Sequence, residues 1–164
     1  MWLEMKVKQL ALDPLSNMPM IILRDAEEKR SLPIWVGLPE ANAIALELEK
    51  ITTARPLTHD LLRNVISDLG ANVEYVFVND LSNDTFYARI MLQVDGRNVE
   101  IDSRPSDAIA LAVRCDAPIF AADDVVESSA IEMEDEDANP VDPETQIAEF
   151  KAFLDDVRPD DFAG

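Results

Sequence analysis

The chain has 164 residues, with 33 acidic side chains against 14 basic ones and a net charge of −19, and this length suits one ordinary domain with its own core. A single cysteine excludes an internal disulfide framework and fits a reducing cytoplasm, and four glycines exclude a glycine-rich phosphate loop. No apolar stretch approaches the roughly 18 residues of a membrane helix and the first residues lack a secretory pattern, so we expect a cytoplasmic protein without a membrane partner.

The first half of the chain predicts strands followed by helices. Runs of apolar residues predict three strands joined by short links, which favour an antiparallel meander, at residues 5–12, 20–23 and 32–36. Pro39 can occupy the first turn of a helix that runs to about Lys50. A second helix is expected after Thr58 as its N-cap, with Gly70 just past its end. The apolar side chains of this second helix are expected to face the core: Leu61, Leu62, Val65, Ile66 and Leu69.

The second half repeats this order. Strands are predicted at residues 73–78, 86–94 and 99–101, with a short one at 119–121. Asp95-Gly96 is a strong hairpin signal. A helix from about Pro105 to Arg114 is apolar on most sides, which indicates burial. Together these blocks predict an α+β fold of two meander-plus-helix halves, with a mixed, largely antiparallel sheet.

The negative charge is concentrated at the C-terminal end. Residues 120–164 carry fifteen acidic and two basic side chains, a net of −13, which leaves −6 for the first 119 residues. We therefore divide the chain into a core domain, residues 1–122, and an acidic linker with a C-terminal amphipathic helix, residues 123–164. That helix, at about 142–157, can dock on the core or on a partner subunit. Alternatively, the segment is a free acidic peptide that competes with nucleic acid or binds a basic protein.

Two similar segments each precede an apolar helix. Arg55-Pro56 is followed by Thr58 and Asp60, and Arg104-Pro105 is followed by Ser106 and Asp107. The proline extends the preceding arginine, while hydroxyl and carboxylate groups suit the free N–H groups of a helix start. Arginine is less natural there because the helix start carries partial positive charge. The two arginines therefore either pair with nearby carboxylates and brace the helices, or bind an anion such as phosphate.

The functional interpretation places these residues in one polar cluster. Its carboxylates can hold Mg²⁺ or Mn²⁺ through oxygen ligands, its arginines can bind phosphate, and its histidine can move a proton. We assign catalytic roles to His59, Asp60, Asp102 and Asp107, phosphate binding to Arg55, Arg104 and Ser106, and metal ligation to Glu40, Asp102 and Asp107. His59 can instead be a local hydrogen-bonding group. If Arg55 and Arg104 are buried against Asp60 and Asp107 with no adjoining cleft, the cluster is better explained as a structural ion-pair network.

The same residues carry a family resemblance. Three blocks, Leu32–Gly37 with Glu40–Ala45, Arg55–Leu61 and Asp102–Ala112, resemble in their order the signature blocks of the bifunctional nuclease domain family. The resemblance covers roughly residues 5–123. It implies an α+β fold, a homo-oligomer with a dimer favoured, and nuclease activity on DNA and RNA.

The leading hypothesis is a divalent-metal-assisted nuclease that hydrolyses phosphodiester bonds in DNA and RNA. The alternative is a noncatalytic oligomeric module that binds a small anion or a protein partner. The charge of the whole chain opposes tight, salt-driven binding to long duplexes, but the modest charge of the core is compatible with a small phosphodiester site.

Overall fold

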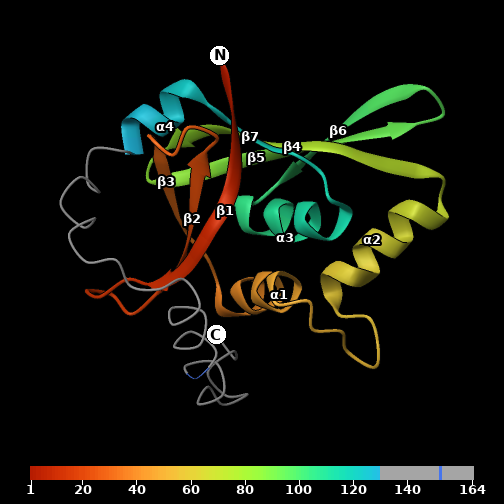
Figure 1. Ribbon diagram of the computed structural model, residues 1–164. Helices are drawn as coiled ribbons and strands as arrows, with labels where there is room; N and C mark the ends of the chain where they lie inside the picture. Colours follow the sequence, from red (N-terminus) through yellow and green to blue (C-terminus); the bar gives the residue numbers. More distant parts are fainter. Residues whose placement is uncertain (130–151, 153–164) are drawn as a thin grey trace.

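The computed structural model describes residues 1–129 and 152, and a seven-stranded sheet organises the described part (Figure 1). The strand order is β3-β2-β1-β7-β4-β5-β6. The strands are β1 (Trp2–Leu12), β2 (Pro19–Asp25), β3 (Ser31–Trp35), β4 (Ala71–Ser82), β5 (Thr85–Val94), β6 (Arg97–Ser103) and β7 (Ile119–Ala122). Two antiparallel meanders flank β7, which runs antiparallel to β1 and parallel to β4. The predicted α+β fold with a mixed, largely antiparallel sheet is confirmed.

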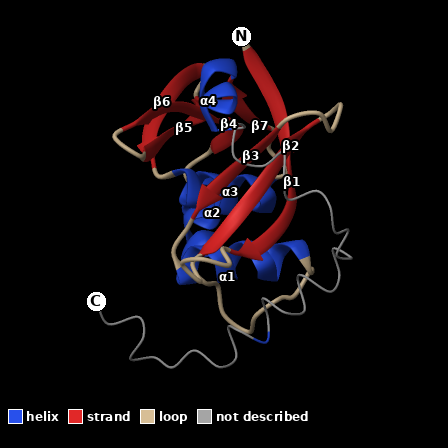
Figure 2. Ribbon diagram, turned by 90° about the vertical axis from the view of Figure 1, so that its left-hand side faces the viewer, coloured by secondary structure: helices blue, strands red, loops and turns tan. Residues whose placement is uncertain are grey.

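Three of the four described helices pack together. The helices are α1 (Leu38–Leu48), α2 (Thr58–Asp68), α3 (Pro105–Cys115) and α4 (Asp123–Ser129). α3 packs against β4 and β5, and both α1 and α2 contact α3. Figures 1 and 2 show these three helices grouped together, away from α4. Within the described residues, no helix has the length and apolar character to cross a membrane.

The start of α3 is fixed at the centre of this packing. Residues Ala108 to Ala112 are fully buried, which confirms the burial predicted from the apolar sequence of this helix. Val76 and Val78 of β4 are also fully buried. Because burying a large apolar side chain stabilises a fold by about 1.5–3 kcal/mol, this contact holds the first turn of α3 in place.

The predicted ends of α2 match the structure to within one residue, but the predicted burial of its apolar face does not. Leu57 is the N-cap, one residue before the predicted Thr58, and Gly70 follows the helix with φ of +78°, a conformation that glycine adopts readily. The inward orientation predicted for the apolar face is wrong. Of its five residues, only Ile66 packs against the core. The other four are 37–77% exposed: Leu61, Leu62, Val65 and Leu69.

α4 lies within the segment predicted to be an acidic linker. Val125 and Val126 are buried and join the core cluster, and Arg30 forms an ion pair with Asp123 at the start of the helix. The apolar contacts of Val125 and Val126 therefore hold α4 against β3, β4 and β7, although the sequence of this segment is acidic. The C-terminal helix predicted at about 142–157 lies outside the described residues.

Candidate functional site

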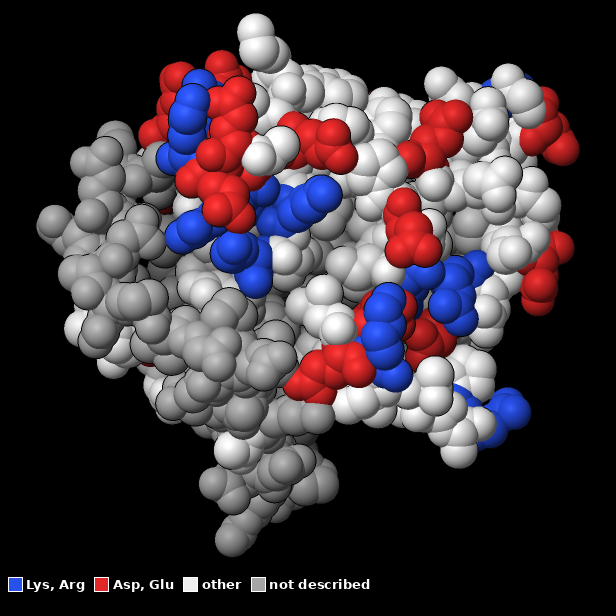
Figure 3. All heavy atoms as spheres, viewed as in Figure 1, with Lys and Arg blue, Asp and Glu red and all other residues white. Residues whose placement is uncertain are grey.

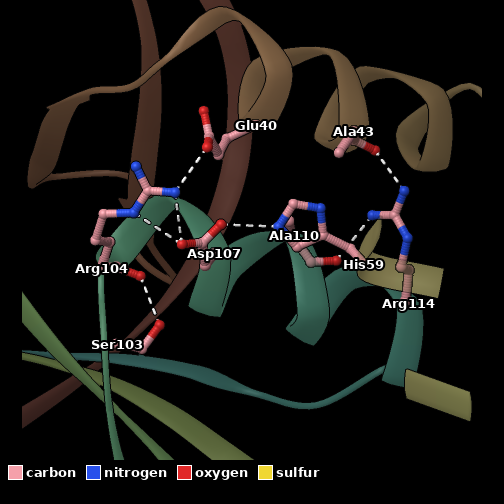
Figure 4. A network of polar contacts seen from close by, with 8 residues as sticks. All are labelled: Glu40, Ala43, His59, Ser103, Arg104, Asp107, Ala110 and Arg114. Atoms are coloured by element: carbon pink, nitrogen blue, oxygen red, sulfur yellow. Dashed lines mark hydrogen bonds and ion pairs between the residues drawn. The ribbon is translucent and has the colours of Figure 1, made fainter. Parts of the chain in front are cut away.

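The structure brings the two Arg-Pro segments together. Arg104 is the N-cap of α3 and is extended (φ −70°, ψ 144°), as expected before a proline. Its Nη2 donates to Glu40 Oε1 of α1 at 2.7 Å, and its Nε donates to Asp107 Oδ2 at 2.8 Å (Figure 4). One guanidinium thus joins the first turns of two helices.

His59 extends this network to a third helix. His59 Nε2 lies 2.9 Å from Asp107 Oδ1, and the histidine side chain is only 9% exposed. A carboxylate only accepts hydrogen bonds, so Nε2–H is the donor and Nδ1 of the neutral ring remains an acceptor. Glu40, Arg104, Asp107 and His59 therefore form one continuous chain of contacts, here called the polar chain (Figure 4).

Arg104 remains available to an anion although it pairs with two carboxylates. Hydrogen bonds from Arg104 to Asp107 and Glu40 raise the pKa of the guanidinium above its ordinary value, so it is permanently charged. Its side chain is 65% exposed, and its hydrogen bonds to described residues come from Nε and Nη2, not from Nη1. The N-terminus of α3 lies beside it, where free N–H groups and the helix dipole also favour negative charge.

The polar chain opens into a groove of about 1730 Å³. All four residues of the chain line it, together with apolar side chains of α2, β5 and β6. Because Arg104 is exposed beside a groove, the condition that favours a purely structural ion-pair network does not hold. The groove therefore has a charged end at the helix starts and an apolar wall along α2 and the facing strands.

Asp60 is engaged elsewhere. Its Oδ1 accepts from Arg114 Nε at 2.7 Å and its Oδ2 accepts from the Leu57 N–H at 3.0 Å. Burial on its own raises the pKa of Asp60, but the hydrogen bonds from Leu57 and Arg114 outweigh it and lower the pKa below the ordinary value. Asp60 does not line the groove, so its observed contacts position the start of α2.

Arg114 was not identified from the sequence. Its side chain is 2% exposed, and it donates to the carbonyls of Ala43 and Ala110 as well as to Asp60. It therefore connects α1, α2 and α3. The one available signal was a charged residue on an otherwise apolar helix, but an arginine in a last helical turn is ordinary because it favours the helix dipole.

Three other predicted site residues lie apart from the polar chain. Arg55 is exposed and forms no ion pair with a described residue, and Ser106 is buried without lining the groove. Asp102 borders the groove, but its carboxylate lies 3.3 Å from Arg89 Nη1 on β5. Within the described part of the chain, no three His, Cys, Asp or Glu side chains are gathered to hold a metal ion. Glu40 and Asp107 are nevertheless close, because both contact Arg104 Nη2.

On the face of the molecule that Figure 3 shows, the charge of the described residues is mixed rather than segregated. On the face shown in Figure 3, basic side chains occur in separate groups bordered by acidic ones, and no continuous basic stripe crosses it. Binding driven by phosphate neutralisation requires clustered lysine and arginine. This face therefore offers no track for a long duplex.

Comparisons with known proteins agree with the resemblance seen in the sequence. The family model described as the bifunctional nuclease domain matches residues 21–134. An uncharacterized protein of Mycobacterium tuberculosis is 40% identical over 162 residues, covering 97% of both chains. Bifunctional nuclease 2 of rice (Oryza sativa subsp. japonica) is 31% identical over 62% of this chain and 32% of the plant protein. Bifunctional nuclease 1 of Arabidopsis thaliana is also 31% identical, over 54% of this chain and 28% of its own length.

Proposed function

Since the chain belongs to the bifunctional nuclease domain family, we propose that it hydrolyses phosphodiester bonds in DNA and RNA at the charged end of the groove. The observation that carries this proposal is the polar chain, in which one exposed arginine and one histidine are held by the same carboxylate, Asp107. A phosphodiester hydrolase needs a cation for the phosphate and a group that accepts a proton from the attacking water. These two groups lie side by side here.

In this proposal Arg104 binds the scissile phosphate. Its Nη1, which donates to no residue in the described part of the chain, and the first N–H groups of α3 offer donors to phosphate oxygens, which gather negative charge as the bond breaks. Glu40 and Asp107 fix the guanidinium from its other edge. A donor whose orientation is set before the substrate arrives stabilises the transition state more than a free side chain does.

His59 accepts the proton of the attacking water. Asp107 accepts from Nε2–H and thereby selects the tautomer in which Nδ1 is free to act as a base. The Asp60–Arg114 ion pair, one residue along α2, positions this imidazole without contacting the substrate. Asp107 and Asp60 consequently have different roles: Asp107 orients reacting groups, and Asp60 orients the helix.

We propose further that Mg²⁺ or Mn²⁺ assists the reaction. Glu40 and Asp107 are the residues placed to hold it, because their carboxylates converge on one nitrogen of Arg104 and Mg²⁺ is commonly bound by one or two carboxylates together with substrate phosphate. A bound divalent ion supplies additional stabilisation of charge on the phosphate. Asp102 is not included in this set because its carboxylate pairs with Arg89 on β5 and does not converge with the other two on Arg104.

The test is cleavage of single-stranded DNA and RNA oligonucleotides by the purified full-length protein, with and without Mg²⁺, Mn²⁺ and a chelator. Wild type is expected to cleave both, and Asp107→Ala and Arg104→Ala to lose nearly all activity. Asp102→Ala, which alters an exposed carboxylate at the edge of the same groove, is the matched control and is expected to remain active. Equal residual activity in wild type, D107A and R104A would indicate a contaminant and contradict the proposal.

A further inference from the structure

Aromatic side chains gather on the face of the sheet opposite the core. They come from the adjacent strands β1, β7 and β4, and we call them the aromatic platform: Trp2, Phe120, Tyr75 and Phe77. Successive side chains of a strand point to opposite faces of a sheet, and the residues that alternate with these rings are buried in the core: Met5, Ile119, Ala121, Val76 and Val78. The four rings therefore point away from the core, and none of them belongs to it.

The other rings of the platform hold Trp2 in one orientation. The Trp2 ring stacks on Phe77, with 4.0 Å between the centroids and 27° between the planes. It also lies 5.5 Å from the Tyr75 ring and 5.9 Å from the Phe120 ring, yet Trp2 is 49% exposed. Since a ring that is already held in place loses little conformational entropy on binding, Trp2 is prepared to stack against a further flat ring.

Basic side chains border the platform along β1 and β2. Lys6 lies farther along β1 and is directly opposite Arg24 of β2, and Lys8 follows it. Like charges that face each other across two strands repel, so an anion is favoured beside them. Glu28, which accepts from Lys8 at 3.0 Å, and Glu4, which lies between the platform and Lys6, offset part of this charge. The border is thus only slightly positive and attracts phosphate weakly.

The platform adjoins the groove across β5 and β6. Phe77 of β4 is paired with Arg89 of β5, and Arg89 is paired with Asp102 of β6. Neighbouring strands lie about 4.8 Å apart, so on the order of 10 Å separates Phe77 from Asp102. Asp102 lines the groove that contains Arg104, and β6 is the edge strand of the sheet. A chain bound on the platform can therefore pass over this edge and reach the charged end of the groove.

We propose that the aromatic platform binds single-stranded DNA or RNA by stacking of its bases, outside the groove in which hydrolysis is proposed to occur. Rings on a sheet face that stack bases, beside cations that attract the backbone, are a common surface for single strands. A duplex keeps its bases paired and stacked on one another, so it does not offer them to Trp2. The choice of nucleic acid as the occupant rests on the proposed function.

The net charge of the chain is compatible with this site because stacking does not require neutralisation of many phosphates. A protein that makes six to ten phosphate contacts loses roughly 1,000-fold or more in affinity between about 50 and about 200 mM salt. The few cations beside the platform predict a loss of no more than about 10-fold over the same range. Weak salt dependence is therefore a signature of this site.

The experiment is fluorescence anisotropy of the full-length protein with a labelled dT strand of about 12 nucleotides, in chelator, with the strand checked on a gel for cleavage. The matched probe is an abasic strand with the same number of phosphates. Trp2→Leu is expected to weaken binding of the dT strand by at least about 10-fold and to leave binding of the abasic strand unchanged. Trp35→Leu alters the other tryptophan, which is 45% exposed on β3, and is expected to bind like wild type. Far-ultraviolet circular dichroism checks folding.

A second measurement uses the fluorescence of Trp2 itself. Trp35→Phe leaves Trp2 as the only tryptophan of the chain, and Trp2→Phe leaves only Trp35. Because a base stacked on an indole quenches its emission, the dT strand is expected to quench W35F and not W2F, and the abasic strand to quench neither.

Four results would overturn this inference. They are wild type that binds the dT strand no better than the abasic strand, a folded W2L variant that binds like wild type, an equal loss in W35L and W2L, and equal quenching of W35F and W2F. Binding is measured here without cleavage. A wild type that passes these tests but cuts no strand would remove the proposed function and leave the platform standing, and one that cuts both strands but fails them would do the reverse.

Discussion

His59 Nε2 lies 2.9 Å from Asp107 Oδ1 although the two residues are 48 positions apart in the chain. The contact joins the first turn of α2 to the first turn of α3, so the two Arg-Pro segments meet through their helices and not through their arginines. Asp107 also accepts a hydrogen bond from Arg104. One carboxylate therefore sets both the tautomer of the buried His59 ring and the position of the Arg104 cation.

Replacing His59 is expected to affect turnover more than binding. His59→Gln places an amide N–H near the position of Nε2 and can keep the hydrogen bond to Asp107, but it offers no base, so kcat on a short oligonucleotide should fall by about 100-fold or more, with KM nearly unchanged. Steady-state kinetics with a fluorogenic single-stranded substrate measures both parameters. A variant with wild-type kcat would exclude His59 as the base.

Replacing Arg104 is expected to weaken substrate binding as well as turnover. Arg104→Lys retains one charge but cannot reach Glu40, Asp107 and a phosphate together, so KM should rise by about 10-fold, and Arg104→Ala should raise it further. Arg55→Lys is the matched control because Arg55 forms no ion pair with a described residue. If R55K and R104K raise KM equally, Arg104 has no special role in binding.

Asp60 is expected to make the stability of the protein depend on acid pH. Its pKa is lowered in the folded state, so the stabilisation is fully present above the ordinary carboxyl value, near pH 4, and is lost as pH falls through the lower folded value. Asp60→Asn leaves Arg114 buried without its carboxylate and should lower the free energy of unfolding by about 3 kcal/mol at neutral pH. Urea unfolding of both proteins at pH 7, 5, 4 and 3 measures this difference.

The difference between wild type and D60N should narrow only below about pH 4. Exposed Asp68 provides the comparison, and Asp68→Asn should change stability little at any of these pH values. A D60N penalty that is the same at pH 3 and pH 7 would show that charge on Asp60 is not responsible.

The thiol of Cys115 is expected to react slowly. Burial raises the pKa of Cys115 above its ordinary value, so less thiolate is present at a given pH than in the unfolded chain. Ellman's reagent at pH 8 should label the native protein at least about 10-fold more slowly than the urea-unfolded protein. Equal rates would show that the thiol is freely accessible in the folded state.

Local signals in the sequence predicted the elements of the fold. Gly70, the Asp95-Gly96 turn and the prolines at the starts of α1 and α3 restrict φ and ψ within a few residues, so they mark boundaries without reference to the rest of the molecule. Periodicity also located the apolar face of α2. It could not tell what covers that face, because an apolar stripe has the same sequence pattern whether it packs on its own core or on another chain.

The candidate site could be predicted only in part, because a local sequence pattern does not show which distant residues a side chain contacts. The doubled Arg-Pro pattern indicated that Arg104, Asp107 and His59 belong to one region, and the structure brings them into contact. The pairing of Asp102 with Arg89 depends on the register between β5 and β6. The burial of Arg114 depends on how helices that are far apart in the sequence pack together. Neither is encoded in the local pattern.

The position of β7 constrains the order in which this protein can be completed during synthesis. Trp2 pairs with Ala122, so the first strand of the chain lies unpaired on its inner edge until the ribosome has made and released almost the whole domain. Until then β1 and β4 each present an open strand edge, and such edges pair readily with other nascent chains. Insertion of the four-residue strand Ile119–Ala122 closes both edges at once. The two half-sheets therefore keep open inner edges until the strand that they share has been made.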